Sequence, residues 1–226
     1  MTEESHALEQ ISVANESYPR KLGNKGQRTR QQLIDATVSL LEKNGLRDVS
    51  VADVARAINS SPATFYVYFK GVPEVVLAAL ENASQTSPEL EALINRDWLA
   101  PGATEAALAF VECYTELWNQ NRNIFAVRNL AAEEGDERFY EARMQQARPM
   151  MVAISEQVKR AQEAGRIPAN LSPNSCGGTI LMMLERLAAI GPVSEGKDGV
   201  SYAELKAAAA YHIAMMLGGA GTGDAA

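Results

Sequence analysis

Apolar residues recur along most of this chain at intervals of three and four positions, which is the spacing of one face of an α-helix. No segment shows a convincing alternation of apolar and polar residues, the pattern that is typical of a β-strand. The pattern therefore predicts an all-α protein. Helices are expected at about residues 25–44, 50–59, 62–70, 73–83, 103–119, 121–132, 137–164, 173–189 and 202–216.

The segment from Ser50 to Lys70 predicts two short helices joined by a tight turn. Ser50 is a suitable N-cap for the first helix, because its hydroxyl can accept a hydrogen bond from a free amide of the first turn. Asn59 stands where a left-handed residue would end that helix. Ser61 can cap the second helix, whose first residue is Pro62, a residue that already has a helical φ angle. These signals predict a helix-turn-helix, which places its second helix in the major groove of DNA.

The second helix of this segment has two distinct faces. Phe65 and Phe69 are one turn apart and are expected to anchor the helix in the core. The opposite side suits a DNA groove. Small and hydroxyl-bearing residues in its middle can face base edges, and phenol groups at its edges can reach phosphates. This groove-facing strip consists of Ala63, Thr64 and Val67, flanked by Tyr66 and Tyr68.

The same segment resembles the DNA-binding segment of the TetR family of bacterial repressors. There, Thr/Ser-Val-x-Asp-Ile/Val-Ala is followed by a turn and by Ser-x-x-Thr-Leu/Phe-Tyr-x-Tyr/His-Phe-Lys, a pattern that residues 50–70 match in type and spacing. The resemblance implies a dimeric DNA-binding regulator. It also implies that phosphates or bases are contacted by Ser50, Thr64, Tyr66, Tyr68 and Lys70, and that Pro62, Ala63 and Val67 face the groove.

The distribution of charge supports a DNA-binding N-terminal part. The whole chain has a net charge of −7, but between Arg20 and Leu80 nine Lys and Arg outnumber five Asp and Glu. A basic part followed by an acidic remainder is typical of a DNA-binding domain attached to a domain that does not contact phosphates. Lys25, Arg28 and Arg30 lie at the start of the first helix, where cations oppose the helix dipole. An anionic partner would explain them, so we count them among the candidate DNA-binding residues.

These observations predict four regions and a homodimer. The regions are a disordered arm at 1–24, a three-helix helix-turn-helix DNA-binding domain at 25–71, a larger helical ligand-binding and dimerisation domain at 72–217, and a flexible tail at 218–226. Gly177, Gly178 and the alanines at 207–210 would allow close approach of the last two helices to other helices. By the resemblance, two such helices from each chain form the dimer interface, and their burial within one chain is the alternative.

The helix at 137–164 is expected to bury one continuous stripe. Its apolar positions are Tyr140, Met144, Ala147, Met151, Ile154, Val158 and Ala161. Pro149 implies a kink, or a break into two helices.

The C-terminal helices are rich in aromatic and methionine side chains, which suit an adaptable apolar cavity as well as an ordinary helical core. We expect a cavity between the stripe from Phe110 to Trp118 and the stripe of the helix at 137–164. Arg122, Arg128 and Glu185 lie close to these stripes and could orient a polar group of a ligand. The candidate ligand-binding residues are Phe110, Tyr114, Trp118, Phe125, Met144, Met151 and Met183.

Little in the sequence supports catalysis. His6 and His212 have no Cys, His or carboxylate at metal-ligand spacing, and no nucleophile elbow or glycine-rich loop follows a strand. Cys113 and Cys176 lie in apolar helical patterns and suggest buried, reduced thiols. No apolar run approaches the roughly 18 residues of a membrane span. We therefore expect no catalytic residues, no metal site, no cofactor, no membrane partner and a cytoplasmic location.

The combined interpretation is a transcriptional repressor that binds a palindromic operator in double-stranded DNA as a dimer. A small lipophilic effector would release it, with an acyl-CoA and a steroid-like molecule among the candidates. One alternative is an all-α lipid-binding or ligand-binding protein, or an enzyme, in which the helix-turn-helix is structural. Another is a DNA-binding architectural protein without a ligand. The basic N-terminal part argues against the first, and an apolar cavity in the C-terminal domain would argue against the second.

Overall fold

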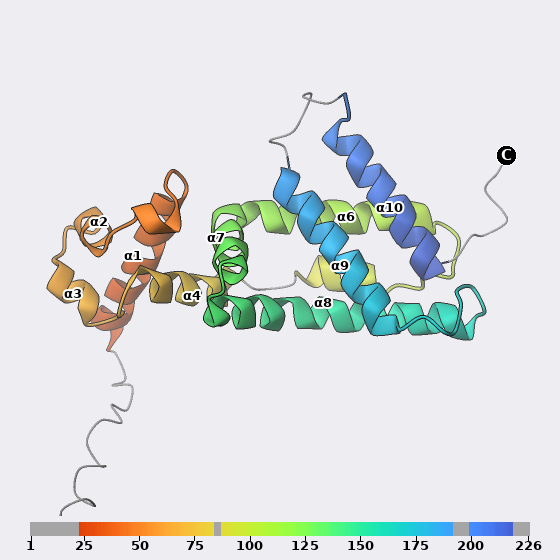
Figure 1. Ribbon diagram of the computed structural model, residues 1–226, viewed down its shortest axis with the longest axis horizontal. Helices are drawn as coiled ribbons and strands as arrows, with labels where there is room; N and C mark the ends of the chain where they lie inside the picture. The colour runs from red at the N-terminus through yellow and green to blue at the C-terminus, as the bar shows by residue number, and fades with distance from the viewer. Residues whose placement is uncertain (1–22, 84–86, 192–198, 219–226) are drawn as a thin grey trace, which may run out of the picture.

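The computed structural model describes residues 23–83, 87–191 and 199–218, and the secondary structure of these residues is helical throughout. The predicted all-α fold is confirmed (Figure 1). In chain order the elements are α1 (Asn24–Leu41), the 3-10 turn η2 (Leu46–Asp48), α2 (Val51–Ala57), α3 (Pro62–Tyr66), α4 (Val72–Ala83), α5 (Pro88–Ile94), α6 (Ala103–Gln120), α7 (Arg122–Glu133), α8 (Glu137–Glu163), α9 (Pro173–Ile190) and α10 (Tyr202–Gly218).

Helices α1 to α4 form a head at one end of the long axis of the molecule (Figure 1). Here α2 packs against α1 and α3, and α4 packs along α1. The predicted three-helix unit is therefore present. The boundary at residues 71 and 72 stays a prediction, although α4 buries Val72, Val75 and Val76 in the same core as Leu33 and Ile34 of α1.

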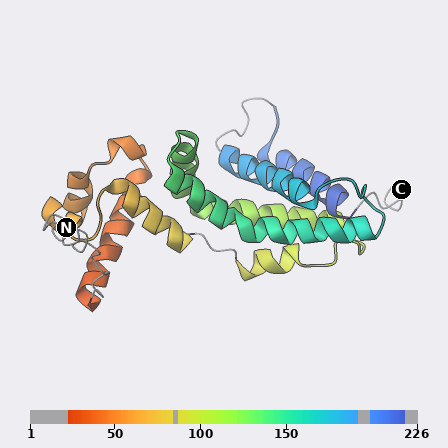
Figure 2. The same cartoon turned by 60° about the horizontal axis from the view of Figure 1, so that its bottom comes forward.

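The remaining helices form a body of three layers (Figure 2). Helices α6 and α8 make the middle layer, and α5 covers one face of it through contacts with both. On the other face, α9 packs mainly on α8, and α10 packs mainly on α6. Helix α7 lies between head and body and contacts α1 and α4 as well as α8.

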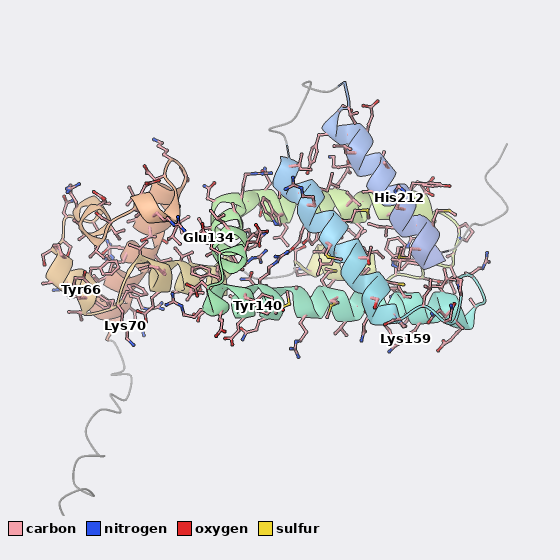
Figure 3. All side chains as sticks on the ribbon, in the orientation of Figure 1. Tyr66, Lys70, Glu134, Tyr140, Lys159 and His212 are labelled. Carbon is pink, nitrogen blue, oxygen red and sulfur yellow. The ribbon has the colours of Figure 1, made fainter. Side chains whose placement is uncertain are left out.

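The buried apolar residues form two clusters. One fills the body, where Phe110, Ile154, Leu184 and Ile213 have essentially no exposed surface. The other begins in the head but continues into the body, since Trp118, Ile124, Phe125, Phe139 and Ala188 belong to the same cluster as the head residues. At the surface, Arg47 of η2 pairs with Glu134 after α7 at 2.9 Å (Figure 3). Such an exposed pair contributes little to stability, so the shared apolar core contributes more to joining head and body.

The predicted stripe of α8 is wrong in its first half. Tyr140 and Met144 are 55% and 40% exposed, whereas Phe139 and Met150 are buried. From Ile154 onward the stripe is buried as predicted. The buried face rotates because α7 packs against the first part of α8, whereas α9 and α10 pack against the later part.

Other boundaries differ more modestly. Helix α8 is continuous through Pro149, so of the two predicted alternatives the break is wrong; Pro149 still cannot donate the usual backbone hydrogen bond. Helix α1 ends at Leu41 rather than near residue 44, α3 ends at Tyr66 rather than near residue 70, and α5 was not predicted. Gly218 ends α10 instead of beginning a tail, while the predicted arm, up to residue 22, and the tail from 219 lie outside the described residues.

Candidate DNA-binding face and ligand cavity

The start of α2 is fixed by a reciprocal pair of hydrogen bonds. The Asp53 amide donates to the Ser50 hydroxyl and the Ser50 amide donates to the Asp53 carboxylate, both at 3.2 Å. The Ser50 hydroxyl also donates to the same carboxylate at 2.5 Å. These bonds from Ser50, together with the Arg56 guanidinium at 2.9 Å, hold the pKa of Asp53 below its usual value. The predicted cap is confirmed, but it also occupies the Ser50 hydroxyl.

The turn into α3 is built as the sequence predicts. Asn59 has a φ of 53° and is the one non-glycine residue with positive φ in the described part of the chain. The Ser61 hydroxyl accepts a hydrogen bond from the Thr64 amide at 3.2 Å, and Pro62 follows as the first residue of the helix. The Thr64 hydroxyl lies 3.1 Å from the Ser61 hydroxyl, so it belongs to the cap and is only partly free to read a base.

Helix α3 is anchored on one side and exposed on the other. Phe65 and Phe69 are buried with ring centroids 5.9 Å apart. On the opposite side Tyr66 is 60% exposed and Val67 is 71% exposed. Figure 3 shows Tyr66 at the outer end of the head, at the opposite end of the molecule from α10. The helix therefore presents side chains to a partner beyond the end of the molecule.

The other candidate DNA-binding residues, on α3 and around it, differ in exposure. Exposed positions are Lys25, Arg28, Pro62, Ala63 and Lys70, while Thr64 and Tyr68 are half-buried. Lys70 lies at the lower edge of the head in Figure 3. Arg30 is half-buried, and its guanidinium carbon lies 5.1 Å from the centroid of the Phe69 ring. Arg30 therefore helps to hold the segment that follows α3 against α1, as well as adding positive charge.

A cavity of about 70 Å³ lies within the body, where helices α4 to α9 meet. Most of its wall is apolar and includes aromatic, leucine and methionine side chains. The lining residues are Ala83, Leu90, Tyr114, Leu117, Trp118, Phe125, Arg128, Gln146, Ala147, Met150, Leu181 and Glu185.

Three charged groups form a cluster at one wall of this cavity. The Glu185 carboxylate accepts from Arg128 at 3.1 Å and from Arg143 at 2.7 Å, so two guanidiniums share one carboxylate. Arg128 is 4% exposed, and its guanidinium also donates to the side chains of Gln146 and Asn129. Burial lowers the pKa of Arg128, and Glu185 only partly offsets this effect.

Gln146 connects this cluster to the helix that leads to the head. Its oxygen accepts from Arg128, and its amide nitrogen donates to the Leu80 carbonyl in α4 at 3.0 Å. Tyr114 also faces the cluster, and burial together with the negative charge of Glu185 raises the pKa of its hydroxyl. Gln146 therefore links the charged cluster to α4 by hydrogen bonds, and Ala83 of α4 lines the cavity itself.

The indole nitrogen of Trp118 has no hydrogen-bond partner among the described residues. Trp118 is 4% exposed, with its ring between Phe125, at 5.9 Å between centroids, and the Arg122 guanidinium carbon, at 4.9 Å from its centroid. Trp98, the other tryptophan, donates its indole N–H to the Ile94 carbonyl at 2.9 Å. Trp118 therefore lacks a hydrogen-bond acceptor, which Trp98 has in the Ile94 carbonyl. A buried donor without an acceptor is unfavourable.

The structure places three of the seven candidate ligand-binding residues at the cavity: Tyr114, Trp118 and Phe125. Phe110 instead packs edge-on against Trp98, Met151 and Met183 pack in the body core, and Met144 is 40% exposed on α8. The candidate list omits Gln146 and Met150, which lie beside the predicted stripe on α8, although Ala147 of that stripe does line the cavity. The list also omits Leu90 of α5, although Ser87 followed by Pro88 is a recognisable helix start, in which the Leu90 amide donates to the Ser87 hydroxyl at 3.0 Å.

The last two helices expose a surface on the face of the body away from α5 (Figure 2). The exposed members include Thr179, Met182 and Arg186 on α9 and Ala208, Tyr211 and His212 on α10. His212 is labelled on α10 in Figure 3. Gly178 has open space where a Cβ would stand, but Gly177 lies against α8, so it permits close packing within the chain and not between chains.

Two features, a metal-binding cluster and a membrane-spanning helix, are absent from the residues that the structure describes. Within 23–83, 87–191 and 199–218, no group of three or more His, Cys, Asp and Glu side chains could hold a metal ion. In the same part of the chain, no helix combines the length and apolar character needed to cross a bilayer.

Comparisons with known proteins agree with this architecture. Residues 33–79 match the family "Bacterial regulatory proteins, tetR family", and residues 90–222, more than half of the chain, match "Tetracyclin repressor-like, C-terminal domain". No curated protein matches the sequence significantly.

Among solved structures, the fatty acid degradation regulator FadR from Bacillus halodurans has a TM-score of 0.62 at 17% identity, covering 89% of this chain and 98% of its own. FadR from Bacillus subtilis in complex with stearoyl-CoA has a TM-score of 0.61 at 16% identity, covering 84% and 98%. A TetR-family transcriptional regulator from Streptomyces coelicolor has a TM-score of 0.60 at 18% identity, covering 86% and 82%. With both parts of the chain matched in order, this protein belongs to the TetR family of bacterial transcriptional regulators.

Proposed function

We propose that this regulator is a repressor that binds a palindromic operator as a homodimer in the cytoplasm and is released by a small lipophilic effector. The observation that carries the proposal is the anchored and exposed geometry of α3. Phe65 and Phe69 fix the helix, while Tyr66 and Val67 project from its free side. In a two-fold dimer, two such helices would read half-sites about one helical turn apart, roughly 34–36 Å.

The manner of DNA reading follows from the side chains on that face. Ala63 and Val67 can contact thymine methyl groups, but neither can form the paired hydrogen bonds that distinguish bases strongly. Tyr66 and Lys70 suit phosphates. We therefore infer modest discrimination at each base, with much of the affinity coming from backbone contacts and DNA shape.

The effector site in this proposal is the cavity between α4 and α9. Its apolar wall suits a lipophilic molecule, and the stearoyl-CoA complex of the Bacillus subtilis relative supports an acyl group as one candidate. Two hydrogen bonds connect the cavity to α4: Arg128 donates to Gln146, and Gln146 donates to the Leu80 carbonyl. A ligand that alters these hydrogen bonds would favour a different position of α4, and therefore a different spacing of the two heads in the dimer.

The dimer surface in this proposal is the exposed face of α9 and α10. Met182 and Tyr211 are large side chains with more than half of their surface exposed, and Gly178 leaves space for a close approach. Two helices from each protomer would then form a four-helix interface. Multi-angle light scattering should give twice the mass of one chain.

The test of DNA binding begins with selection of genomic fragments by the purified protein at moderate salt, followed by affinity measurements on the selected site. Tyr66→Phe and Lys70→Ala should weaken binding to all sequences alike. Loss of one lysine from each protomer should lower the slope of log K against log salt by about 1.8, since each phosphate contact contributes about 0.9. Selection without any sequence preference would refute the proposal.

Two surface variants on α8, outside the head, serve as controls: Tyr140 lies at the end of α8 nearer the head and Lys159 near its far end (Figure 3). Tyr140→Phe removes a phenol hydroxyl from a side chain that is 55% exposed, close to the 60% of Tyr66. Lys159→Ala removes a lysine whose amine lies 3.2 Å from Glu156 on the surface of α8. Neither control should change the affinity for DNA or the salt slope.

A further inference from the structure

The cluster at the cavity wall has more positive than negative charge. Arg128 and Arg143 both pair with Glu185, which leaves one positive charge without a carboxylate inside the cluster. The other side chains that bond to Arg128 are Gln146 and Asn129, which are neutral. Arg143 is partly exposed, but Arg128 is almost fully buried, so water cannot compensate the charge on its guanidinium as it would at the surface.

The unpaired indole N–H of Trp118 is a second and independent sign of a missing group. Trp118 lines the same cavity as Arg128 and Glu185. Both Trp118 and Arg128 lie against Phe125, with the Arg128 guanidinium carbon 4.7 Å from the centroid of the Phe125 ring. An acceptor that is also an anion would satisfy the N–H donor and balance the extra positive charge together.

The rest of the cavity determines what the anion is attached to. Leu90, Leu117, Phe125, Met150 and Leu181 present apolar surface. The cavity of about 70 Å³ is smaller than the roughly 150 Å³ cavity that accepts benzene. A chain of a few carbons fits with little adjustment, and the flexible side chain of Met150 can move for a longer one.

We propose that the cavity binds an organic acid with an apolar body, and that Arg128 and the indole N–H of Trp118 hold its carboxylate. The proposal rests on the proposed function only in taking this cavity as the effector site. A carboxylate at Arg128 would compete with Gln146, the residue that also bonds to Leu80 of α4. Binding of the acid would therefore act directly on the contact between the cavity and α4.

The test compares acids with their neutral amides at equal chain length. Butanoate, hexanoate and decanoate, each with its primary amide, are titrated into the full-length protein by calorimetry. At one or more lengths the acid should bind at least about tenfold more tightly than the amide, because a hydrogen bond to a charged group is stronger than one to a neutral group. Equal binding of acid and amide at every length, or no binding of either, would overturn the proposal.

The two tryptophans of the chain provide matched variants. Trp98→Phe leaves Trp118 as the single tryptophan. Binding of the acid with the highest affinity should then change the fluorescence of Trp118, and the affinity of this variant for the acid should equal that of the wild type. Trp118→Phe should weaken acid binding by about tenfold because the N–H donor is lost. If both variants bind the acid equally, Trp118 does not hold the carboxylate and the proposal fails.

Arg143→Gln tests the charge without altering the cavity wall. Arg143 is partly exposed and does not line the cavity, and its loss leaves a balanced Arg128–Glu185 pair. The acid should then lose about tenfold in affinity while its amide is unaffected. An unchanged preference for the acid would contradict the charge argument.

A titration with hexanoyl-CoA distinguishes failure of this proposal from failure of the proposed function. If hexanoyl-CoA binds and releases a selected operator while no free acid binds, the carboxylate site is wrong but the ligand-responsive repressor stands. If an acid binds as described and no operator can be selected, the cavity assignment stands and the repressor proposal fails.

Discussion

Gly177 and Gly178 are neighbours in α9 with opposite surroundings, so the same substitution at each should have different results. An ideal Cβ on Gly177 would stand 2.6 Å from the Ser155 hydroxyl oxygen and 3.2 Å from the Met151 carbonyl oxygen, both in α8. A Cβ on Gly178 would have no heavy atom within 4 Å beyond its chain neighbours and the nearby backbone of its own helix. Gly177→Ala therefore pushes α9 away from α8, and Gly178→Ala does not.

The magnitude follows from two terms. Both substitutions gain the helix propensity of Ala over Gly, about 0.5–1 kcal/mol, and this gain cancels when the two variants are compared. Overpacking at Gly177 costs about 1–3 kcal/mol, which should be the difference in unfolding free energy between the variants. For a chain of this length, that difference corresponds to about 2–12 °C in Tm.

Thermal unfolding followed by circular dichroism measures this difference. A double variant, Ser155→Ala with Gly177→Ala, should recover part of the loss because the shortest contact disappears. The proposed dimer places Gly178 between protomers, so each melt is repeated at two protein concentrations. Gly177→Ala melting at or above Gly178→Ala at both concentrations would refute the argument that α8 and α9 approach too closely for a methyl group.

Three further predictions concern the helix-turn-helix. Asn59→Gly should keep or slightly raise stability, whereas Asn59→Val should lose about 1–2 kcal/mol in urea unfolding, since a β-branched residue disfavours positive φ. Ser61→Ala should cost about 1 kcal/mol in the same assay by removing the cap of α3, with Ser60→Ala as the neighbouring control. The pKa of Asp53 is lower in the folded chain, so on acidification this carboxylate is protonated first in the unfolded chain. The stabilisation by the ionised Asp53 is therefore present above pH 3.8 and is lost as the pH falls through the folded pKa. The difference in Tm between the wild type and Asp53→Asn should therefore shrink between pH 6 and pH 3.

The features predicted correctly from the sequence are those that depend on a few consecutive residues. The Ser50 and Ser61 caps each act on an amide three positions along the chain, and the left-handed conformation of Asn59 depends on its own backbone. Phe65 and Phe69 are buried because they lie four positions apart, in α3 and just after it, and turn toward the same side. In each case the interaction is encoded by residue type and local spacing.

The cavity was predicted less well because its members come from helices distant in the sequence. Met144 is apolar but exposed, and Gln146 is polar but reaches the cavity, since α7 and α9 decide which side of α8 is covered. Gln146 bonds to Leu80, and Arg128 to Glu185, across 66 and 57 positions of the chain. Helical periodicity cannot specify such pairs, so only the proximity of charged residues to the apolar stripes pointed toward them.

The apolar core shared by head and body bears on how chimeric regulators of this protein should be built. Joining its head to the body of a relative between α4 and α5 would leave the α4 side chains facing foreign counterparts of Ile124, Phe125 and Phe139. A graft that also carries α7 and the first turns of α8 would transplant the complementary surfaces together. For exchange of operator specificity, the transferable module is therefore discontinuous in sequence: two segments, separated by α5 and α6, that have to move as one.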